Sequence, residues 1–379
     1  MHQEKRQNVS LVERKEKTLN SETLELAGHA IEHEFVVRYE RYPDEHTISV
    51  YIQRCLDSVP GQNKLSGYYT ARREWGSIKD ELVEIGQELG GGSLASVWEM
   101  TTTNGEEALK VLNPNTRFYV DSLCDILEQT FASMEDTYPR HAQLGVLAVR
   151  DIREWLIADI EYEGFREKDE MFRAVNHGFT TDDSDYTIYV PQSYGEDSIY
   201  YKREEKIDGM NLTKIEELTE RGEDIKGIAQ LLAKNAVHQI ITGIVHSDFH
   251  PGNIRVMDNN RVAVLDRNFF IELDMSEKML LGRLISESTD TILFTFASYL
   301  STLEANGDIQ NLPHTLSKAI DKNGIDLNSP DGVAQAIATA KEAGIYVPLK
   351  VTLLVKNFMS LDKFCKTARF TFVKEAIAS

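Results

Sequence analysis

Three polar side chains lie at spacings that suit phosphoryl transfer in the stretch from Gly243 to Phe269, GIVHSDFHPGNIRVMDNNRVAVLDRNF. Asn253 follows Asp248 by five positions, and Asp266 follows thirteen positions later. Phosphoryl transfer needs a positioned acceptor, neutralised phosphate charge and held metal ions more than covalent help from the protein. In a loop of the form H-x-D-x-x-x-x-N, the aspartate orients the acceptor and the asparagine holds Mg²⁺. We therefore predict Asp248 as the catalytic aspartate, with Asn253 and Asp266 as metal ligands.

A glycine-rich turn lies upstream, where Gly90, Gly91, Gly92 and Ser93 separate two strand-like segments. Glycine has no Cβ, so a phosphate can approach the backbone N–H groups of such a turn closely. Lys110 lies in the next strand, within the apolar run ALKVL, where a lysine is costly unless it is paired. The α- and β-phosphates of a nucleotide would supply that pairing. The simpler alternative is an edge-strand lysine whose charged end reaches solvent.

The elements that must position these side chains can be predicted from local patterns. The segments ELVEIGQELGGGSLASVWEM and EEALKVL predict three strands of a small antiparallel sheet. Residues 225–242 have the apolar spacing of an amphipathic helix that leads into the candidate loop. Strands at 254–257 and 262–265 flank the turn DNNR, so the candidate site would lie on loops at the two ends of a hairpin.

The remaining segments alternate between helix and strand. They predict helices at 21–35, 121–134 and 146–174, a strand-like alternation within 36–54, a linker at 60–66, strands within 186–207, and mainly helix after the hairpin to about residue 374.

The order of these elements predicts an α+β, bilobal protein-kinase-like fold. An antiparallel sheet with a glycine turn and an included helix would form the first lobe, and a helical part carrying the loop and hairpin would form the second. The predicted divisions are an N-terminal extension of unknown role at 1–75, a kinase-like N-lobe at 76–205 and a kinase-like C-lobe at 206–379.

Composition narrows the classes of function. A formal net charge of −20 argues against nucleic-acid binding, because phosphate contacts need concentrated lysine and arginine. ATP remains compatible, since backbone N–H groups, one or two lysines and Mg²⁺ suffice to hold it. The three scattered cysteines and the charged start predict a cytoplasmic protein without a secretory signal. No apolar run approaches the roughly 20 residues of a membrane helix, so we predict peripheral membrane contact at most.

The chain resembles the UbiB/AarF (ABC1-like, ADCK) family of atypical protein-kinase-like proteins. The resemblance covers roughly residues 86–370, and HSDFHPGNI is its most specific part. The other segments that carry it are LGGGSLASVWEM with ALKVLNP, DIEYEGFREKDEMF with YVPQSY, KIDGMNL, VAVLDRNF and, more weakly, LLVKNFMSLDKFCKTARF.

The resemblance implies an ATP- and Mg²⁺-binding kinase or ATPase that acts on an unknown acceptor, which could be a small molecule, a lipid or a protein. It implies that Lys110 holds the α- and β-phosphates and that residues 204–207, including Glu205, form the hinge against which adenine stacks. The paired acids of the family would be Asp159 and Glu161, in exchanged order. His246 would support the catalytic loop rather than react.

This chain departs from the family pattern at several positions. The glycine turn stands where the family loop is rich in alanine, and Arg267-Asn268 follow Asp266 where Phe-Gly is usual. Phe165 occupies the position expected for the glutamate that pairs with the lysine. We predict that Glu161, one helical turn earlier, takes that role; Glu163 and Glu167 are alternatives if the helix shifts. The K-x-G-Q element of the family is absent from its normal place.

Three other functions compete with this interpretation. His246, Asp248 and His250 alternate as the ligands of a metal hydrolase could on a strand, although Pro251-Gly252 favours a loop. A small-molecule kinase of the aminoglycoside or choline type also uses the H-x-D-x-x-x-x-N pattern. A catalytically silent nucleotide-binding scaffold would account for Arg267-Asn268 and the absent helix glutamate.

Overall fold

The structure is a computed structural model that describes residues 42–58, 82–91, 94–113, 115–162, 164–195, 198–286, 289–307, 311–325, 327 and 329–370. The chain divides into two compact units, the first of residues 1–60 and 115–156, the second of residues 61–114 and 157–379. The predicted helix at 21–35, the linker at 60–66 and the boundary between residues 75 and 76 lie outside the described residues. Every predicted site residue belongs to the second unit.

The described part of the first unit is helical, with α2 (Glu45–Ser58), α4 (Thr116–Ala132) and most of α5 (Pro139–Ile160). The strand-like alternation predicted within 36–54 is wrong where the structure describes it, because residues 45–54 lie in α2. Ile48, Ile52 and Leu56 recur every fourth residue and are almost fully buried, which is the spacing of one helix face. The Asp44 side chain accepts the backbone N–H of Thr47 at 2.9 Å and caps the first turn.

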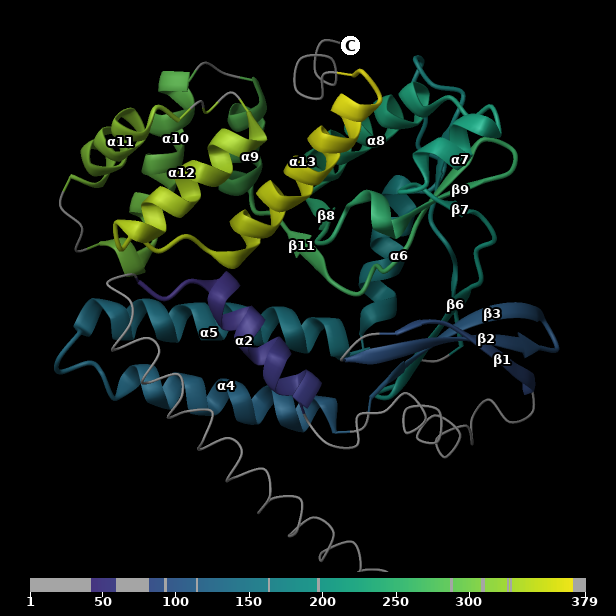
Figure 1. Cartoon of the computed structure of the whole chain (residues 1–379), viewed down its shortest axis with the longest axis horizontal. Coiled ribbons are helices and arrows are strands. Elements are labelled where there is room, and N and C mark those ends of the chain that lie inside the picture. Colours follow the sequence, from purple (N-terminus) through teal and green to yellow (C-terminus); the bar gives the residue numbers. More distant parts are fainter. Residues whose placement is uncertain are drawn as a thin grey trace, which may run out of the picture. The chain divides into compact units, whose positions relative to one another are not determined.

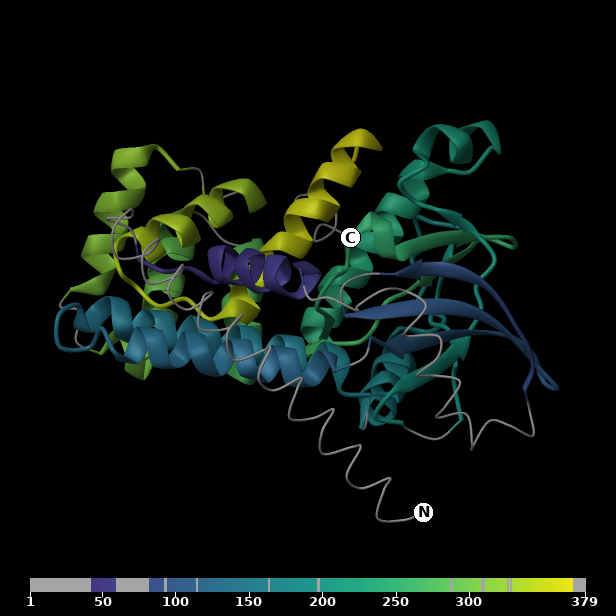
Figure 2. The same cartoon turned by 60° about the horizontal axis from the view of Figure 1, so that its bottom comes forward.

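A five-stranded antiparallel sheet in the second unit confirms the predicted strands on both sides of the glycine turn. Figure 1 labels most of its strands, and Figure 2 shows the long blue strands lying side by side. Lys110 stands in the third strand, opposite Val97 on one side and Lys202 on the other. The strand order is β1 (Leu82–Gly91), β2 (Ala95–Thr102), β3 (Gly105–Leu112), β6 (Tyr201–Glu205) and β5 (Ser193–Tyr194).

The helix predicted at 146–174 is interrupted. The chain leaves α5 at Ile160 and re-enters a helix at Phe165, where α6 (Phe165–Asn176) begins. Gly164 takes a φ of 77°, a left-handed conformation that glycine adopts without steric cost and that ends one helix direction before another begins. The break places Asp159 at the end of α5 and Asp169 within α6.

The catalytic-loop region is built on α8 (Ile225–Thr242), whose bounds match the predicted helix. Asp224 caps its start by accepting the N–H of Gly227, and Gly243 ends it with a φ of 87°. The predicted hairpin is also confirmed, as β9 (Ile254–Met257) and β10 (Arg261–Val264). The neighbouring short elements are β4 (Thr187–Tyr189), β7 (Met210–Asn211), α7 (Ile215–Glu220), β8 (Ile244–His246), the 3₁₀ turn η1 (Pro251–Asn253) and β11 (Phe270–Glu272).

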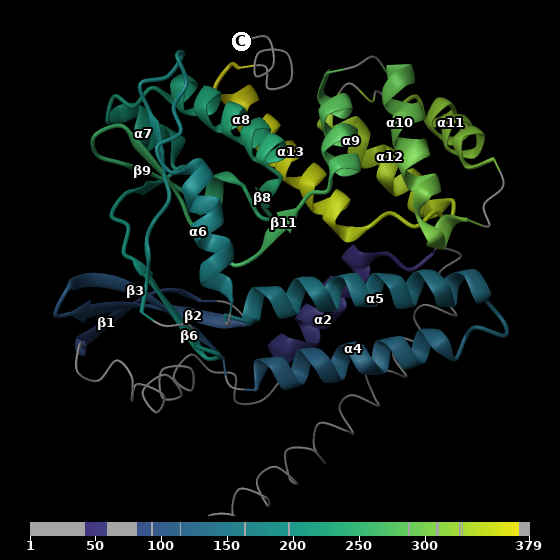
Figure 3. The same ribbon diagram turned by 180° about the vertical axis from the view of Figure 1, so that it is seen from behind.

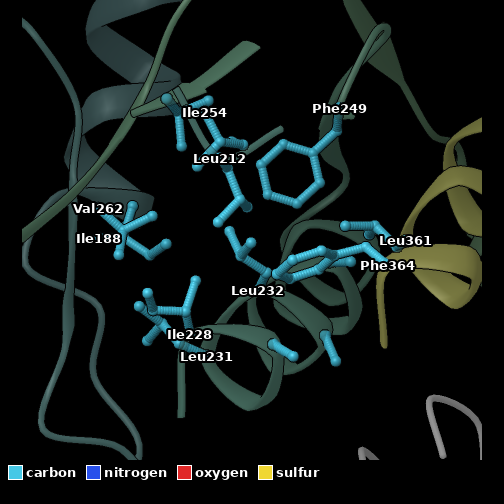
Figure 4. Close-up of a cluster of buried hydrophobic side chains, with 14 of the residues drawn as sticks. Ile188, Leu212, Ile228, Leu231, Leu232, Phe249, Ile254, Val262, Leu361 and Phe364 are labelled. Carbon is cyan, nitrogen blue, oxygen red and sulfur yellow. The ribbon is translucent and has the colours of Figure 1, made fainter. Parts of the chain in front are cut away.

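One apolar core fixes the hairpin and the loop against α8 and α13 (Leu349–Thr367). Figure 4 shows Phe249 of the loop pointing into this cluster beside Leu212 and Phe364. Phe249 is only 2% exposed. Burying a side chain of this size stabilises the fold by about 1.5–3 kcal/mol, so the loop residue next to Asp248 is anchored by packing.

The rest of the second unit is helical, as predicted, and Figure 3 shows it from behind. A second apolar core packs these helices together, with Leu300, Leu316 and Ala336 fully buried. No helix in the described part of the chain is long and apolar enough to cross a membrane. The additional helices are α9 (Met275–Ser286), α10 (Thr289–Thr302), the 3₁₀ turn η2 (Glu304–Asn306), α11 (Leu312–Asn323) and α12 (Pro330–Glu342).

Candidate active site

A cavity of about 710 Å³ lies between the five-stranded sheet and the loops that flank the β9–β10 hairpin. Cavities of about 300–1,000 Å³ accommodate small ligands and cofactors. The predicted site residues that line it are Gly90, Gly91, Lys110, Glu205, Asn253 and Asp266.

Gly90 faces this cavity from the end of β1. A Cβ atom added at Gly90 would meet no other atom within 4 Å, so the packing of the protein does not require glycine there. Gly92 and Ser93, the other half of the predicted phosphate loop, lie outside the described residues.

Lys110 and Asp266 form an ion pair at the floor of the cavity, with Nζ 2.9 Å from Oδ1. Burial opposes the lysine charge, but the carboxylates of Asp159 and Asp266 outweigh it and raise the pKa of Lys110. The charge of Lys110 in turn outweighs burial of the carboxyl group and lowers the pKa of Asp266 to about 2. Both groups therefore carry their charges at neutral pH.

Asp266 has an unusual backbone conformation, with a φ of 54°. Aspartate and asparagine adopt this left-handed region more easily than most residues. The side-chain amide of Asn268 donates to Oδ1 of Asp266 and to Oδ1 of Asp159, each at 2.8 Å. Asn268 thus joins the two carboxylates that surround Lys110.

His246 joins the candidate catalytic loop to the segment before Asp266. Its Nδ1 accepts the backbone N–H of Asp248 at 3.0 Å, and its Nε2 donates to the carbonyl oxygen of Leu265 at 2.9 Å. Burial lowers the pKa of His246, so the neutral imidazole makes both bonds. From α13, Asn357 donates to the His246 carbonyl at 2.8 Å. Both histidine nitrogens are engaged, which leaves His246 a supporting role.

Asp248 contacts a lysine and a histidine side chain at its exposed end. Lys356 of α13 lies 3.2 Å from Oδ1, and His250 Nε2 lies 3.2 Å from Oδ2. Burial opposes the carboxylate charge, but the hydrogen bond from His250 and the charge of Lys356 outweigh it and lower the pKa of Asp248. A carboxylate with so low a pKa accepts a hydrogen bond from an acceptor hydroxyl or water, rather than storing a proton.

Asn253 and Asp266 have the chemistry of a magnesium site. The Asn253 amide nitrogen donates to the backbone oxygen of Asp248 at 3.0 Å, which leaves its amide oxygen for a cation. The backbone oxygen of Asn253 accepts the N–H of Leu265 at 2.8 Å, which ties it to the residue before Asp266. Mg²⁺ is usually bound by one or two such oxygens together with phosphates and water, so these residues fit the ion.

Among the described residues, no three His, Cys, Asp or Glu side chains gather around a possible ion position. In the hydrolase alternative, His246 could not serve as a ligand, because its Nδ1 accepts the backbone N–H of Asp248 and its Nε2 donates to the carbonyl oxygen of Leu265.

The hinge segment closes one side of the cavity. Glu205 accepts the Tyr189 hydroxyl at 2.6 and 2.8 Å and the backbone N–H of Gln192 at 3.2 Å. Lys206 forms ion pairs with Glu99 and Glu106. These contacts hold the end of β6 in place, where the sequence predicted that adenine would stack.

Glu161, predicted to pair with Lys110, is exposed on the segment after α5, and that pairing stays a prediction. Its alternative Glu163 lies outside the described residues. Sequence reasoning did not assign Asn268 or Lys356 to the site. Asn268 stood out as a departure from the family pattern, whereas Lys356 is 108 positions from its partner Asp248 and gives no local signal.

The family model described as the ABC1 atypical kinase-like domain matches residues 77–291, which is more than half of the chain. The chain belongs to the ABC1 atypical kinase-like family. The resemblance inferred from sequence is thereby confirmed, and membership supports a kinase-like function.

Among curated proteins, this ABC1 family member is similar to the chloroplastic protein Activity of BC1 Complex Kinase 1 of Arabidopsis thaliana. They share 23% identity over 182 residues, 45% of this chain and 27% of that protein. The chain therefore matches about a quarter of the length of that relative. The predicted cytoplasmic location stays a prediction, since the name of this relative describes it as chloroplastic.

Among solved structures, the chain resembles that of the Rv3197–erythromycin complex from Mycobacterium tuberculosis. The TM-score is 0.56 and the identity 14%, over 98% of this chain and 97% of that one. A likeness at this identity concerns the fold. Together with the family match, it confirms the α+β, bilobal kinase-like fold.

Proposed function

We propose that this protein binds ATP with Mg²⁺ in the cavity between the sheet and the hairpin, and transfers the terminal phosphoryl group to an acceptor or to water. The observation that supports the proposal is that one cavity is lined by Lys110, Asn253 and Asp266. Lys110 is far in sequence from the other two residues, which lie at the two ends of one hairpin. A kinase site needs these types together: a cation for phosphates, and oxygens for the metal.

Each side chain would take a role that its surroundings suit. Lys110, held charged by Asp159 and Asp266, would bind the α- and β-phosphates once a nucleotide competes for its ammonium group. Asn253 and Asp266 would hold Mg²⁺, which supplies neutralisation of phosphate charge when bound. Asp248 would orient the acceptor hydroxyl or a water molecule. Gly90 would let a phosphate approach the backbone.

The first test is nucleotide binding, measured as the shift in thermal unfolding temperature with ATP, ADP and GTP, each with and without Mg²⁺. A ligand that binds only the folded state raises its stability by mass action. We expect Mg²⁺-ATP to raise the unfolding temperature by a few degrees. The variants Lys110→Met and Asp266→Asn should abolish the shift, and asparagine can retain the left-handed backbone of Asp266.

A matched control is provided by another lysine–aspartate pair of the same unit. Lys234 and Asp183 lie 2.5 Å apart, with exposed fractions of 16% and 47%, against 15% and 48% for Lys110 and Asp266. Lys234→Met and Asp183→Asn should therefore leave the nucleotide shift intact. If no nucleotide stabilises the wild-type protein, the proposal fails.

A second readout separates turnover from binding. Release of inorganic phosphate from ATP would show hydrolysis without any knowledge of the acceptor. Mg²⁺-ATP stabilisation with no phosphate release, and no transfer to any of a panel of small-molecule, lipid and protein acceptors, would favour the nucleotide-binding scaffold over the enzyme.

A further inference from the structure

Arg267, the residue after Asp266, is completely buried and uses both ends of its guanidinium group. Nε donates to Asp169 Oδ1 at 2.7 Å, and one terminal nitrogen donates to Asp169 Oδ2 at 3.2 Å, to the Pro191 carbonyl at 2.9 Å and to Glu204 Oε1 at 3.2 Å. The other terminal nitrogen donates to the Val264 carbonyl at 3.0 Å. The Arg267 side chain is therefore hydrogen-bonded to separate segments of the chain.

Two of these partners line the cavity, and a third belongs to a neighbouring helix. Asp169 belongs to α6 and also accepts the Ser193 hydroxyl at 2.6 Å. Pro191 and Glu204 line the cavity on the hinge side. Arg267 therefore ties the backbone next to Asp266 to a helix and to the hinge segment.

The backbone at Asp266 needs such support. Its φ of 54° lies in a sparsely populated region, and such conformations persist where the surroundings over-determine them. In kinases with a D-F-G segment, an apolar phenylalanine follows the metal-binding aspartate, and its packing distinguishes active from inactive states. If the guanidinium moved out of this position, the carboxylate of Asp169 would stay buried without its cationic partner. Leaving a buried charge unpaired in this way is strongly unfavourable.

We propose that Arg267 is a positioning residue that holds Asp266 in its metal-binding orientation. It acts through the backbone and does not touch the cavity contents itself. This role rests on the proposed function, because it concerns the same magnesium ion. It predicts that weakening the Arg267 network lowers the affinity for Mg²⁺ while leaving metal-free nucleotide binding largely intact.

The test uses the full chain carrying Asp169→Asn together with Arg267→Met, so that neither charge is left buried alone. The control carries Glu107→Gln with Arg203→Met. Arg203 and Glu107 are a buried pair of the same unit, joined at 2.7 and 2.9 Å. The measurement is the Mg²⁺ concentration that gives half of the maximal thermal stabilisation by ATP, together with binding of ADP in EDTA.

The expected result is a Mg²⁺ half-saturation raised by about tenfold or more in the Arg267 variant, the usual effect of removing groups that orient metal ligands. ADP binding in EDTA should stay within about twofold of the wild type, and the control variant should match the wild type in both measurements. A residue with only a structural role would weaken both kinds of binding, or neither.

Two results would overturn the proposal: a wild-type Mg²⁺ response in the Arg267 variant, or an equal rise in the control. If circular dichroism shows that the double variant is unfolded, Arg267→Lys replaces it, since lysine keeps the buried charge but not the planar fork. A wild-type Mg²⁺ response in Arg267→Lys would equally overturn the role. Failure of the proposed function is distinct, because the wild-type protein itself would then show no stabilisation by Mg²⁺-ATP, and the role of Arg267 would fall with it.

Discussion

The two candidate aspartates lie in opposite surroundings. Asp266 is bordered by Arg267, which is fully buried, and by Asn268, which is 7% exposed. Asp248 is held by Lys356, whose side chain is 60% exposed, and by His250, whose side chain is 33% exposed. The backbone beside Asp266 is thus fixed by a buried arginine, and Asn268 donates to its carboxylate. The Asp248 carboxylate accepts from Asn253 at 3.3 Å, and its other side-chain partners are partly exposed.

This difference matches the different tasks proposed for the two carboxylates. A metal ligand must keep its geometry. A site whose ligands were held only by mobile groups would bind the metal ion less tightly. A residue that contacts the acceptor must stay accessible to it, and the water around that residue must leave when the acceptor binds. Exposed partners such as Lys356 can shift at little cost, because surface ion pairs contribute little to stability.

The largest effect that would test this comparison is the loss of stability from Arg267→Met alone. Removing one partner of a buried pair leaves Asp169 unpaired, which costs about 3–5 kcal/mol. Urea unfolding would measure it, with Arg221→Met as the control. Arg221 also pairs with carboxylates but its side chain is 38% exposed, so that variant should lose less than about 1 kcal/mol. Equal losses would contradict the contrast between the two regions.

The next effect concerns turnover. Asp248→Asn should slow phosphate release from Mg²⁺-ATP by about a hundredfold or more, because an amide accepts the acceptor hydrogen bond more weakly than a carboxylate. Thermal stabilisation by Mg²⁺-ADP should persist, since Asp248 is not part of the proposed metal site. Loss of nucleotide binding in this variant would show that the two aspartates do not have separate tasks.

The sequence predicts some elements of this arrangement correctly and others not. The helix at 225–242 and the hairpin strands were predicted well because their signals are local: a cap at Asp224, a glycine end at Gly243 and alternating apolar residues. The segment at 45–54 is predicted as a strand but forms a helix. Its β-branched residues fit both periods, and only the burial of every fourth side chain distinguishes helix from strand.

Prediction of the site from the sequence is limited to residues that are close together in the chain. The spacing of Asp248, Asn253 and Asp266 could be found from the motif, since a short loop and a hairpin separate them. The partners that hold them could not. Asp169 lies 98 positions before Arg267, and Lys356 lies 108 positions after Asp248. Arg267 was visible only as a departure from the family pattern, without any indication of its buried partner.

A smaller effect is expected in the acid limb of the stability profile. The charge of Arg267 outweighs burial and lowers the pKa of Asp169 below its ordinary value of about 3.9. A lowered folded-state pKa adds stability that is present above about pH 4 and is lost as the pH falls below it. Urea unfolding at pH 6 and pH 3 should therefore show a larger loss in the wild type than in the Asp169→Asn, Arg267→Met variant. Equal losses would mean that this pair does not contribute to acid sensitivity.

The smallest effect is expected from Lys356→Met at the exposed end of the site. Because the Lys356 side chain is 60% exposed, its removal should change the free energy of unfolding by less than about 1 kcal/mol. That difference should shrink further between about 0.05 M and 1 M salt, as the ion pair with Asp248 is screened. Urea unfolding at both salt concentrations would measure it. A salt-independent loss as large as that of Arg267→Met would show that Asp248 is held as rigidly as Asp266, and the contrast between the two aspartates would no longer stand.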